Sequence, residues 1–163
     1  MPGEKVMAMG SFSISLEAFK VKTEKQMVTA CQKIAMECWK RVIMKNPVDT
    51  GRFRANWGCR VGSPYAETLD STDKYGAQAI GKAVTVTSGW NGKGSIFLCN
   101  NLPYATVLEF GGYPNPPEVG TRVKGKAFGS IRSVGGYSYQ APGGMVRVTV
   151  SEMQNGAAEA VVK

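Results

Sequence analysis

The chain has 163 residues, 43% of them hydrophobic and 20% charged, and its formal net charge is +8. A chain of this length buries roughly 70% of the surface that its unfolded form exposes, so it can fold without a disulfide or a metal ion. The composition excludes wholesale disorder, and we expect a single domain over residues 1–163.

The sequence contains no histidine. This absence excludes Ser-His-Asp and Cys-His nucleophiles, histidine-ligated zinc and imidazole acid–base catalysis. We also find no pair of carboxylates with the spacing of an acid–base site, so we expect no enzyme activity, no catalytic residue, no cofactor and no metal. The four cysteines lack CxxC spacing and are expected to be small buried side chains: Cys31, Cys38, Cys59 and Cys99.

Neither a signal peptide nor a membrane span is predicted. The first residues, MPGEKVMAMGSF, have no long apolar core, and no later run approaches the roughly 20 apolar residues of a span. We expect a soluble, non-secreted protein with no membrane partner.

Most of the positive charge lies in one quarter of the chain. Between Lys20 and Arg60, ten Lys and Arg residues oppose three acidic residues, so seven of the eight net charges arise there. A basic face of this kind could meet either nucleic acid or an acidic protein surface.

The N-terminal segment is predicted to begin as a strand over 11–19, because apolar and polar residues alternate there. Thr23 and Gln26 then form a possible capping box that starts a helix over 23–45. Pro47 ends this helix, because the residue before a proline disfavours helical geometry. Apolar residues recur at helical spacing along it: Met27, Cys31, Ile34 and Cys38.

The segment NPVDTGRFRANWG follows directly and predicts a sharp corner. Asp49 and Thr50 can bond nearby backbone amides, and Gly51 can adopt positive φ without a steric penalty. Phe53 and Trp57 lie four residues apart, which favours burial on one side of a helical turn or a strand entry over a stacking platform for single-stranded nucleic acid. Two arginines beside them, Arg52 and Arg54, are expected to point outward.

Further elements are predicted in the middle of the chain. Ser71 or Thr72 caps a short helix that runs into a strand at 83–90, and a second strand at 95–101 completes a hairpin over 83–99. A short helix over 102–112 ends at a double glycine. The carboxylate of Glu109 is expected to bond a nearby turn or an arginine.

Residues 111–140 predict an extended loop or arm, because glycine and proline are concentrated there. The arm includes GTRVKGKA, which resembles a phosphate-binding loop but has Ala127 in place of the hydroxyl that binds magnesium, so no nucleotide site is expected. The final segment is ambiguous, because Val146, Val148 and Val150 alternate as in a strand while other apolar residues follow helical spacing.

Three motifs occur in a fixed order: PVDTGRFR at 47–54, YATVLEFG at 104–111 and QAPGGM at 140–145. Together they resemble the tail-completion or head-to-tail joining family of long-tailed bacteriophages. The family has leucine before the second arginine of the first motif, where this chain has Phe53. The chain also departs from the family pattern in the thirty-residue insertion rich in glycine and proline between the second and third motifs.

The resemblance implies an α+β fold, in which a small antiparallel sheet is packed by a long N-terminal helix and a C-terminal helix over about Pro142–Ala160. It also implies an oligomeric ring, a hexamer, at the head-to-tail junction of the virion, made in the host cytoplasm. The ring would contact head-completion or connector proteins and the tail-tube protein, and DNA would pass through its lumen without sequence preference.

The motifs and the basic residues of the corner and the arm give two groups of candidate residues. The motif residues expected to be structural are Pro47, Asp49, Thr50, Gly51, Phe53, Trp57, Tyr104, Glu109 and Gly111. Those expected to face a neighbouring subunit or DNA are Arg52, Arg54, Arg122, Lys124, Lys126 and Arg132. A small basic nucleic-acid-binding module is the alternative, because it accounts for the net charge without a ring.

Overall fold

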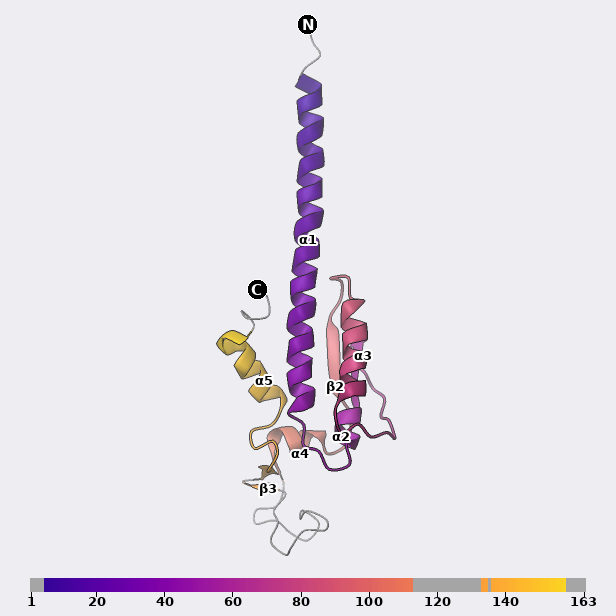
Figure 1. Cartoon of the computed structure of the whole chain (residues 1–163), viewed down its shortest axis with the longest axis vertical. Helices are drawn as coiled ribbons and strands as arrows, with labels where there is room; N and C mark the ends of the chain where they lie inside the picture. Colours follow the sequence, from indigo (N-terminus) through magenta and orange to yellow (C-terminus); the bar gives the residue numbers. More distant parts are fainter. Residues whose placement is uncertain (1–4, 113–132, 135, 158–163) are drawn as a thin grey trace, which may run out of the picture.

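The computed structural model describes residues 5–112, 133–134 and 136–157, and these form an α+β fold (Figure 1). One long helix, α1 (Lys5–Met44), extends from a small body built around its C-terminal part. The other elements are α2 (Arg52–Ala55), β1 (Trp57–Val61), α3 (Ala77–Ser88), β2 (Ile96–Asn100), α4 (Ala105–Phe110), β3 (Ser133–Val134), β4 (Tyr137–Ser138), α5 (Val146–Glu152) and a π-helical turn (Met153–Ala157).

Helix α1 begins earlier than the sequence pattern predicts, so the strand expected over 11–19 is wrong. Thr23 is not a cap, because its hydroxyl donates to the carbonyl of Phe19 one turn earlier in the same helix, at 2.9 Å. The end of the helix is confirmed, since α1 stops at Met44, shortly before Pro47.

The sheet has two antiparallel strands, with Trp57 of β1 opposite Asn100 of β2. A hairpin over 83–99 is wrong, because residues 83–88 belong to helix α3, which packs on both β1 and α1. Ala79, Ala83 and Thr87 recur four residues apart and are all buried, so tertiary packing overrides the strand preference of the valines and threonines.

Helix α5 lies on the other side of α1 from the sheet and α3 (Figure 1). The helical prediction for this segment is therefore confirmed over Val146–Glu152, although the helix begins later than Pro142. It continues into a kinked π-helical turn in which Gly156 has φ of 109°. Residues 158–160 of the predicted helix lie outside the described residues.

The core joins the C-terminal end of α1 to α2, β1, α3, α4 and the segment before α5. Its buried apolar members are Val42, Ile43, Phe53, Trp57, Ala79, Leu102, Leu108, Ala141 and Met145. The cysteines are free and, contrary to expectation, not fully buried; Cys31 is exposed and Cys59 is half-buried. Burial raises the pKa of the Cys59 thiol to about 11.

The prediction of an arm over 111–140 falls largely outside the described residues, which omit 113–132 and 135. The GTRVKGKA segment lies there, as do Arg122, Lys124, Lys126 and Arg132. Strands β3 and β4 pair at the end of this segment, with Val134 opposite Tyr137.

Gly51 makes the corner after α1. Its φ is 89°, and its carbonyl accepts hydrogen bonds from the amides of Ala55 and Asp73, at 3.0 and 3.1 Å. A Cβ atom here would lie 2.7 Å from the backbone nitrogen of Lys74. Both the backbone conformation and the close approach of a second segment therefore require glycine.

We expect Gly51→Ala to lower the free energy of unfolding by about 2–3 kcal/mol, because positive φ strain and a backbone clash add together. Gly62→Ala is the matched control, since Gly62 has φ of 86° but nothing within 4 Å of the added Cβ; it should cost about 1 kcal/mol. Urea denaturation measures both values, and equal losses would contradict the role of Gly51 at this close contact.

Candidate functional site

The three motifs of the sequence meet at one end of the body, where α4 lies near the base of α1 (Figure 1). The rings of Phe53 and Tyr104 are 5.7 Å apart, which joins the first motif to the second. The Gln140 side chain joins the third motif to the first, since its amide accepts from Val48 N at 2.9 Å and donates to Val48 O at 3.1 Å. We call the segments 47–57, 104–111 and 140–147 the motif cluster.

Arg54 lies inside the motif cluster and is only 7% exposed, so the prediction that it points outward is wrong. Its guanidinium donates to three backbone carbonyl oxygens, those of Lys74 at 2.6 Å, Met44 at 3.0 Å and Asn46 at 3.0 Å. Carbonyl groups at the end of a helix lack partners within the helix, and a cation there also complements the helix dipole. Arg54 therefore caps the C-terminal end of α1. Burial lowers its pKa from the ordinary arginine value.

Arg52, by contrast, keeps its predicted exposure, with a side chain that is 50% exposed. Its guanidinium lies 3.7 Å from Asp70, whose side chain is 97% exposed, and such a pair adds little stability. The turn before it forms as expected, because Thr50 Oγ1 accepts a hydrogen bond from the amide of Arg52 at 3.2 Å. Asp49 is exposed and Pro47 is half-buried. Of the two arginines in this motif, only Arg52 is available to a partner.

Phe53 and Trp57 are buried as predicted, each with 6% of its surface exposed. Their rings meet edge to face at a centroid distance of 6.1 Å, a favourable geometry for aromatic pairs. Tyr104, at the start of α4, packs against Phe53 but remains 39% exposed. The aromatic residues therefore anchor the corner in the core and leave one ring at the surface.

Glu109 is the second buried charge of the motif cluster, at 8% exposed. Its carboxylate accepts from the backbone amides of Met145, Val146 and Arg147 at 2.8–2.9 Å. This confirms the expected role of a helix-end carboxylate bonding a nearby turn, and it caps the N-terminal end of α5. Burial raises the pKa of Glu109. The three amide hydrogen bonds and the Arg147 charge lower it, and their combined effect exceeds that of burial, so the pKa lies below its ordinary value.

Arg147 adds a second tie between α4 and α5. Its guanidinium donates to the carbonyl of Glu109 at 2.6 Å and lies over the ring of Phe110, 5.0 Å from the centroid. Gly111 ends α4 with φ of 82°, as the double glycine predicts, and its amide donates to the Val107 carbonyl at 2.9 Å. An added Cβ at Gly111 would meet the Gly136 carbonyl at 3.2 Å.

Sequence reasoning missed two buried polar residues that shape the site. Asp73 is the cap of α3, because its carboxylate accepts from the amides of Gly76, Gln78 and Ala79; neither Ser71 nor Thr72 has this role. Asn56, 1% exposed, bonds both backbone groups of Leu69. An acidic residue shortly before the predicted helix was the available signal for Asp73, whereas nothing local indicates the partner of Asn56.

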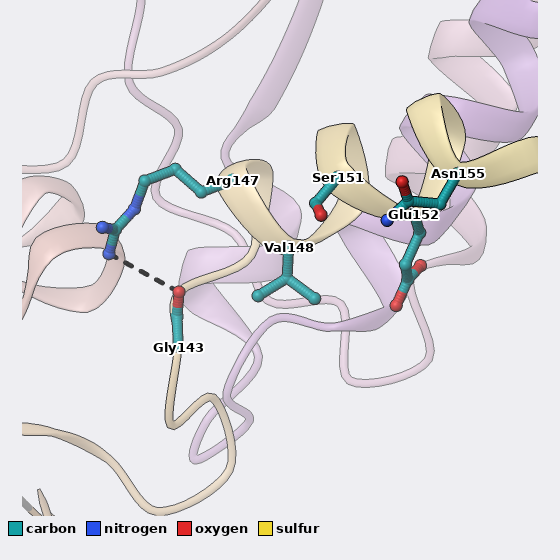
Figure 2. Close-up of a pocket in the computed structure, with 6 residues that line it drawn as sticks. All are labelled: Gly143, Arg147, Val148, Ser151, Glu152 and Asn155. Atoms are coloured by element: carbon teal, nitrogen blue, oxygen red, sulfur yellow. Dashed lines mark hydrogen bonds between the residues drawn. The ribbon is translucent and has the colours of Figure 1, made fainter.

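A surface pocket of about 610 Å³ lies along α5, and Figure 2 shows its lining residues on α5 and on the segments that adjoin it. Arg147 donates to the carbonyl of Gly143 across one end, at 3.5 Å. Glu152 is the only base in the lining, and it is engaged by Lys45 at 2.8 Å and Arg41 at 3.6 Å. Ser151 therefore has no activating base within this pocket.

Within the part of the chain that the structure describes, no group of three or more acidic or cysteine side chains could hold a metal ion. No helix there is long and apolar enough to cross a membrane. The two buried charged side chains of the motif cluster, Arg54 and Glu109, are instead occupied by backbone hydrogen bonds. Comparisons with protein families, with curated proteins and with solved structures found no match to this chain.

We expect Arg54→Met to lower the free energy of unfolding by about 3 kcal/mol or more, because it leaves three carbonyl groups at the end of α1 and at Lys74 without their donor. Arg52→Met, the matched control two residues away, should change it by less than about 0.5 kcal/mol. Chemical denaturation measures the free energy of unfolding of both variants. A loss for Arg54→Met as small as that for Arg52→Met would contradict the buried, capping role of Arg54.

The Glu109 carboxylate predicts a pH-dependent stability. Because its folded pKa lies below the ordinary value of 4.5, its contribution is present above pH 4.5 and is lost as the pH falls through the folded pKa. We expect Glu109→Gln to be less stable than the wild type by about 1–3 kcal/mol at pH 7, with a gap that narrows below pH 4.5. Denaturation series over pH measure this gap.

The matched control for this series is Glu67→Gln, because the Glu67 side chain is 64% exposed. Its difference from the wild type should stay small at every pH. A constant gap for Glu109→Gln across the same pH range would show that the carboxylate charge has no part in holding α5.

Proposed function

We propose that this chain is a structural virion protein of the phage head-to-tail junction, where it completes or terminates the tail as a hexameric ring through which DNA passes. It performs no chemistry in this role. Its partners are other copies of the chain, head-completion or connector proteins and the tail-tube protein.

One observation carries the proposal: the three motifs that resemble the joining family form one contact network in space. The first and third motifs lie 92 residues apart where Val48 meets Gln140, and the second and third lie 36 apart where Glu109 meets Met145. Motif residues that hold one another through hydrogen bonds between side chains and distant backbone groups form a rigid scaffold. A subunit of a closed ring needs such a scaffold, because the geometry of its contacts determines closure.

The surface chemistry of the described residues also supports assembly over catalysis. Every buried charged side chain there caps a helix or a turn, and the pocket along α5 lacks an activated nucleophile. Large apolar side chains are instead exposed along α1, where Phe19 is 68% exposed and Met27 is 63% exposed. Exposed apolar surface on a folded chain is typical of protein–protein contact.

A small basic nucleic-acid-binding module is the second candidate, and the lysines of α1 favour it. Lys22, Lys25, Lys33 and Lys40 are all exposed and lie on one side of the helix. Binding to a DNA duplex that weakens steeply with rising salt, with a slope reduced when these lysines are replaced, would support this candidate. The two candidate functions do not exclude each other, because a ring with DNA in its lumen would also contact DNA.

We expect phage that lack this protein to fill heads with DNA and to polymerise tail tubes, because neither process needs the joining ring. Heads and tails should remain apart, or tails should vary in length, and added purified protein should restore infectivity. Electron microscopy of the deletion mutant and a plaque assay of the supplemented lysate measure both effects. Intact virions with attached tails of uniform length would overturn the proposal.

The rescue assay also tests the exposed arginine of the motif cluster. Arg52→Glu should reduce rescue while the isolated subunit stays folded, because exposed charges contribute little to stability. Lys93→Glu carries the same charge reversal at an exposed turn away from the motif cluster and should rescue as the wild type does. Equal rescue by the two variants would count against Arg52 as a contact residue.

A further inference from the structure

Helix α1 presents a basic face to the solvent. Lys22, Lys25, Lys33 and Lys40 are all exposed. At about 100° per residue, Lys22, Lys33 and Lys40 lie within about 20° of one another around the helix, and Lys25 lies about 60° to one side. From Lys22 to Lys40 the distance along the helix axis is about 27 Å. We call these four residues the lysine face.

Two other faces of α1 are held by the rest of the described chain. On the first, Gln32 donates to the carbonyl of Trp90 at 2.8 Å, and Ile43 is buried in the core. On the second, Lys45 meets Glu152 of α5 at 2.8 Å. The lysine face lies between these two faces, and the N-terminal part of α1 extends beyond the body (Figure 1).

The charges of the lysine face are not neutralised within α1. The acidic residues between Lys22 and Lys40 are Glu24 and Glu37. Glu24 lies about 160° from Lys22 around the helix, and Glu37 accepts a hydrogen bond from Arg41 at 2.7 Å. The ion pairs among the described residues include none of the four lysines. The lysine face therefore presents a row of positive charge to an anionic partner.

The composition of this face favours nucleic acid over protein as that partner. Protein–protein interfaces are depleted of lysine and enriched in aromatic residues and arginine. The lysine face has neither, because the only aromatic residue of α1 between Lys22 and Lys40 is Trp39, which is 8% exposed. Its other exposed side chains are Gln26 and Thr29, which can donate to phosphate oxygens.

The lack of an exposed ring also distinguishes between two forms of nucleic acid. Proteins that bind single strands stack the bases on aromatic side chains, whereas the outer surface of a duplex is its charged backbone. Lysine suits this backbone, because its ammonium group is a point charge that needs no fixed geometry. A duplex is therefore the better match to the lysine face.

We propose that the lysine face binds the phosphate backbone of double-stranded DNA without sequence preference. The inference rests on the part of the proposed function in which DNA passes through the ring, and it assigns the DNA contact to one side of one helix. In the ring, α1 of each copy then faces the lumen. With the two axes parallel, the face follows the duplex over about eight base pairs.

The test is a titration of the full-length protein with a labelled duplex, read by fluorescence anisotropy at salt concentrations from about 50 to about 200 mM. The test variant is Lys22→Gln with Lys33→Gln. The matched control, Lys20→Gln with Lys74→Gln, removes the same charge from exposed positions elsewhere, since Lys20 lies about 160° from Lys22 around α1 and Lys74 precedes α3. Circular dichroism checks that all three proteins fold.

Four lysine–phosphate contacts predict a wild-type affinity that falls about 150-fold over this range of salt, because each contact contributes about −0.9 to the slope of log affinity against log salt. The test variant keeps two of the contacts, so its affinity should be lower at about 50 mM salt and should fall only about 12-fold. The control should follow the wild type, and a duplex of different sequence should bind equally well.

Three results would overturn the DNA contact: no binding by the wild type, the same salt dependence in both variants, or tighter binding of a single strand than of the duplex. Loss of rescue in the lysate assay by the test variant, with its DNA binding unchanged, would also overturn it and would indicate an acidic protein partner. Each of these results leaves the junction role standing, because the deletion phage tests that role without reference to DNA binding.

Discussion

Two buried side chains of opposite charge hold the ends of two helices, and the arrangement of the other elements depends on them. Arg54 donates to carbonyl groups at the C-terminal end of α1, and Glu109 accepts from amides at the N-terminal end of α5. In each case a full charge faces a helix end whose partial charge has the opposite sign. Each side chain also supplies the hydrogen bonds that a helix end lacks.

These contacts connect segments that are distant in the chain, so the motif cluster works as one unit. Arg54 also reaches Lys74, next to the Asp73 carboxylate that caps α3, so the ends of α1 and α3 share one polar network. Phe53 and Tyr104 add apolar contact on the core side. A unit of this kind fixes the direction in which α1 leaves the body, and the proposed ring would need this direction to be the same in every copy.

Local chemistry was enough to predict the corner, but not the partners of its charged residues. Pro47 and Gly51 act through their own backbone preferences, so the end of α1 and the positive φ could be read from the sequence. Arg54 looked like a surface charge because its acceptors lie 8, 10 and 20 residues away and are backbone atoms that no sequence pattern marks. Residues 83–88 were predicted as a strand from their valines and threonines. They form part of a helix because packing on α1 and β1 outweighs this local preference.

The length of α1 gives the molecule a mechanical property. Its 40 residues span about 60 Å, and the other elements pack only around its C-terminal part. The free part, from Lys5 to about Gln32, is about 40 Å long, so a tilt of about 10° where the body holds the helix would move its N-terminal end by about 7 Å. In the proposed ring, contacts near the C-terminal end of α1 would therefore define the position of a neighbouring subunit closely, whereas contacts near its N-terminal end would tolerate neighbours at varied distances.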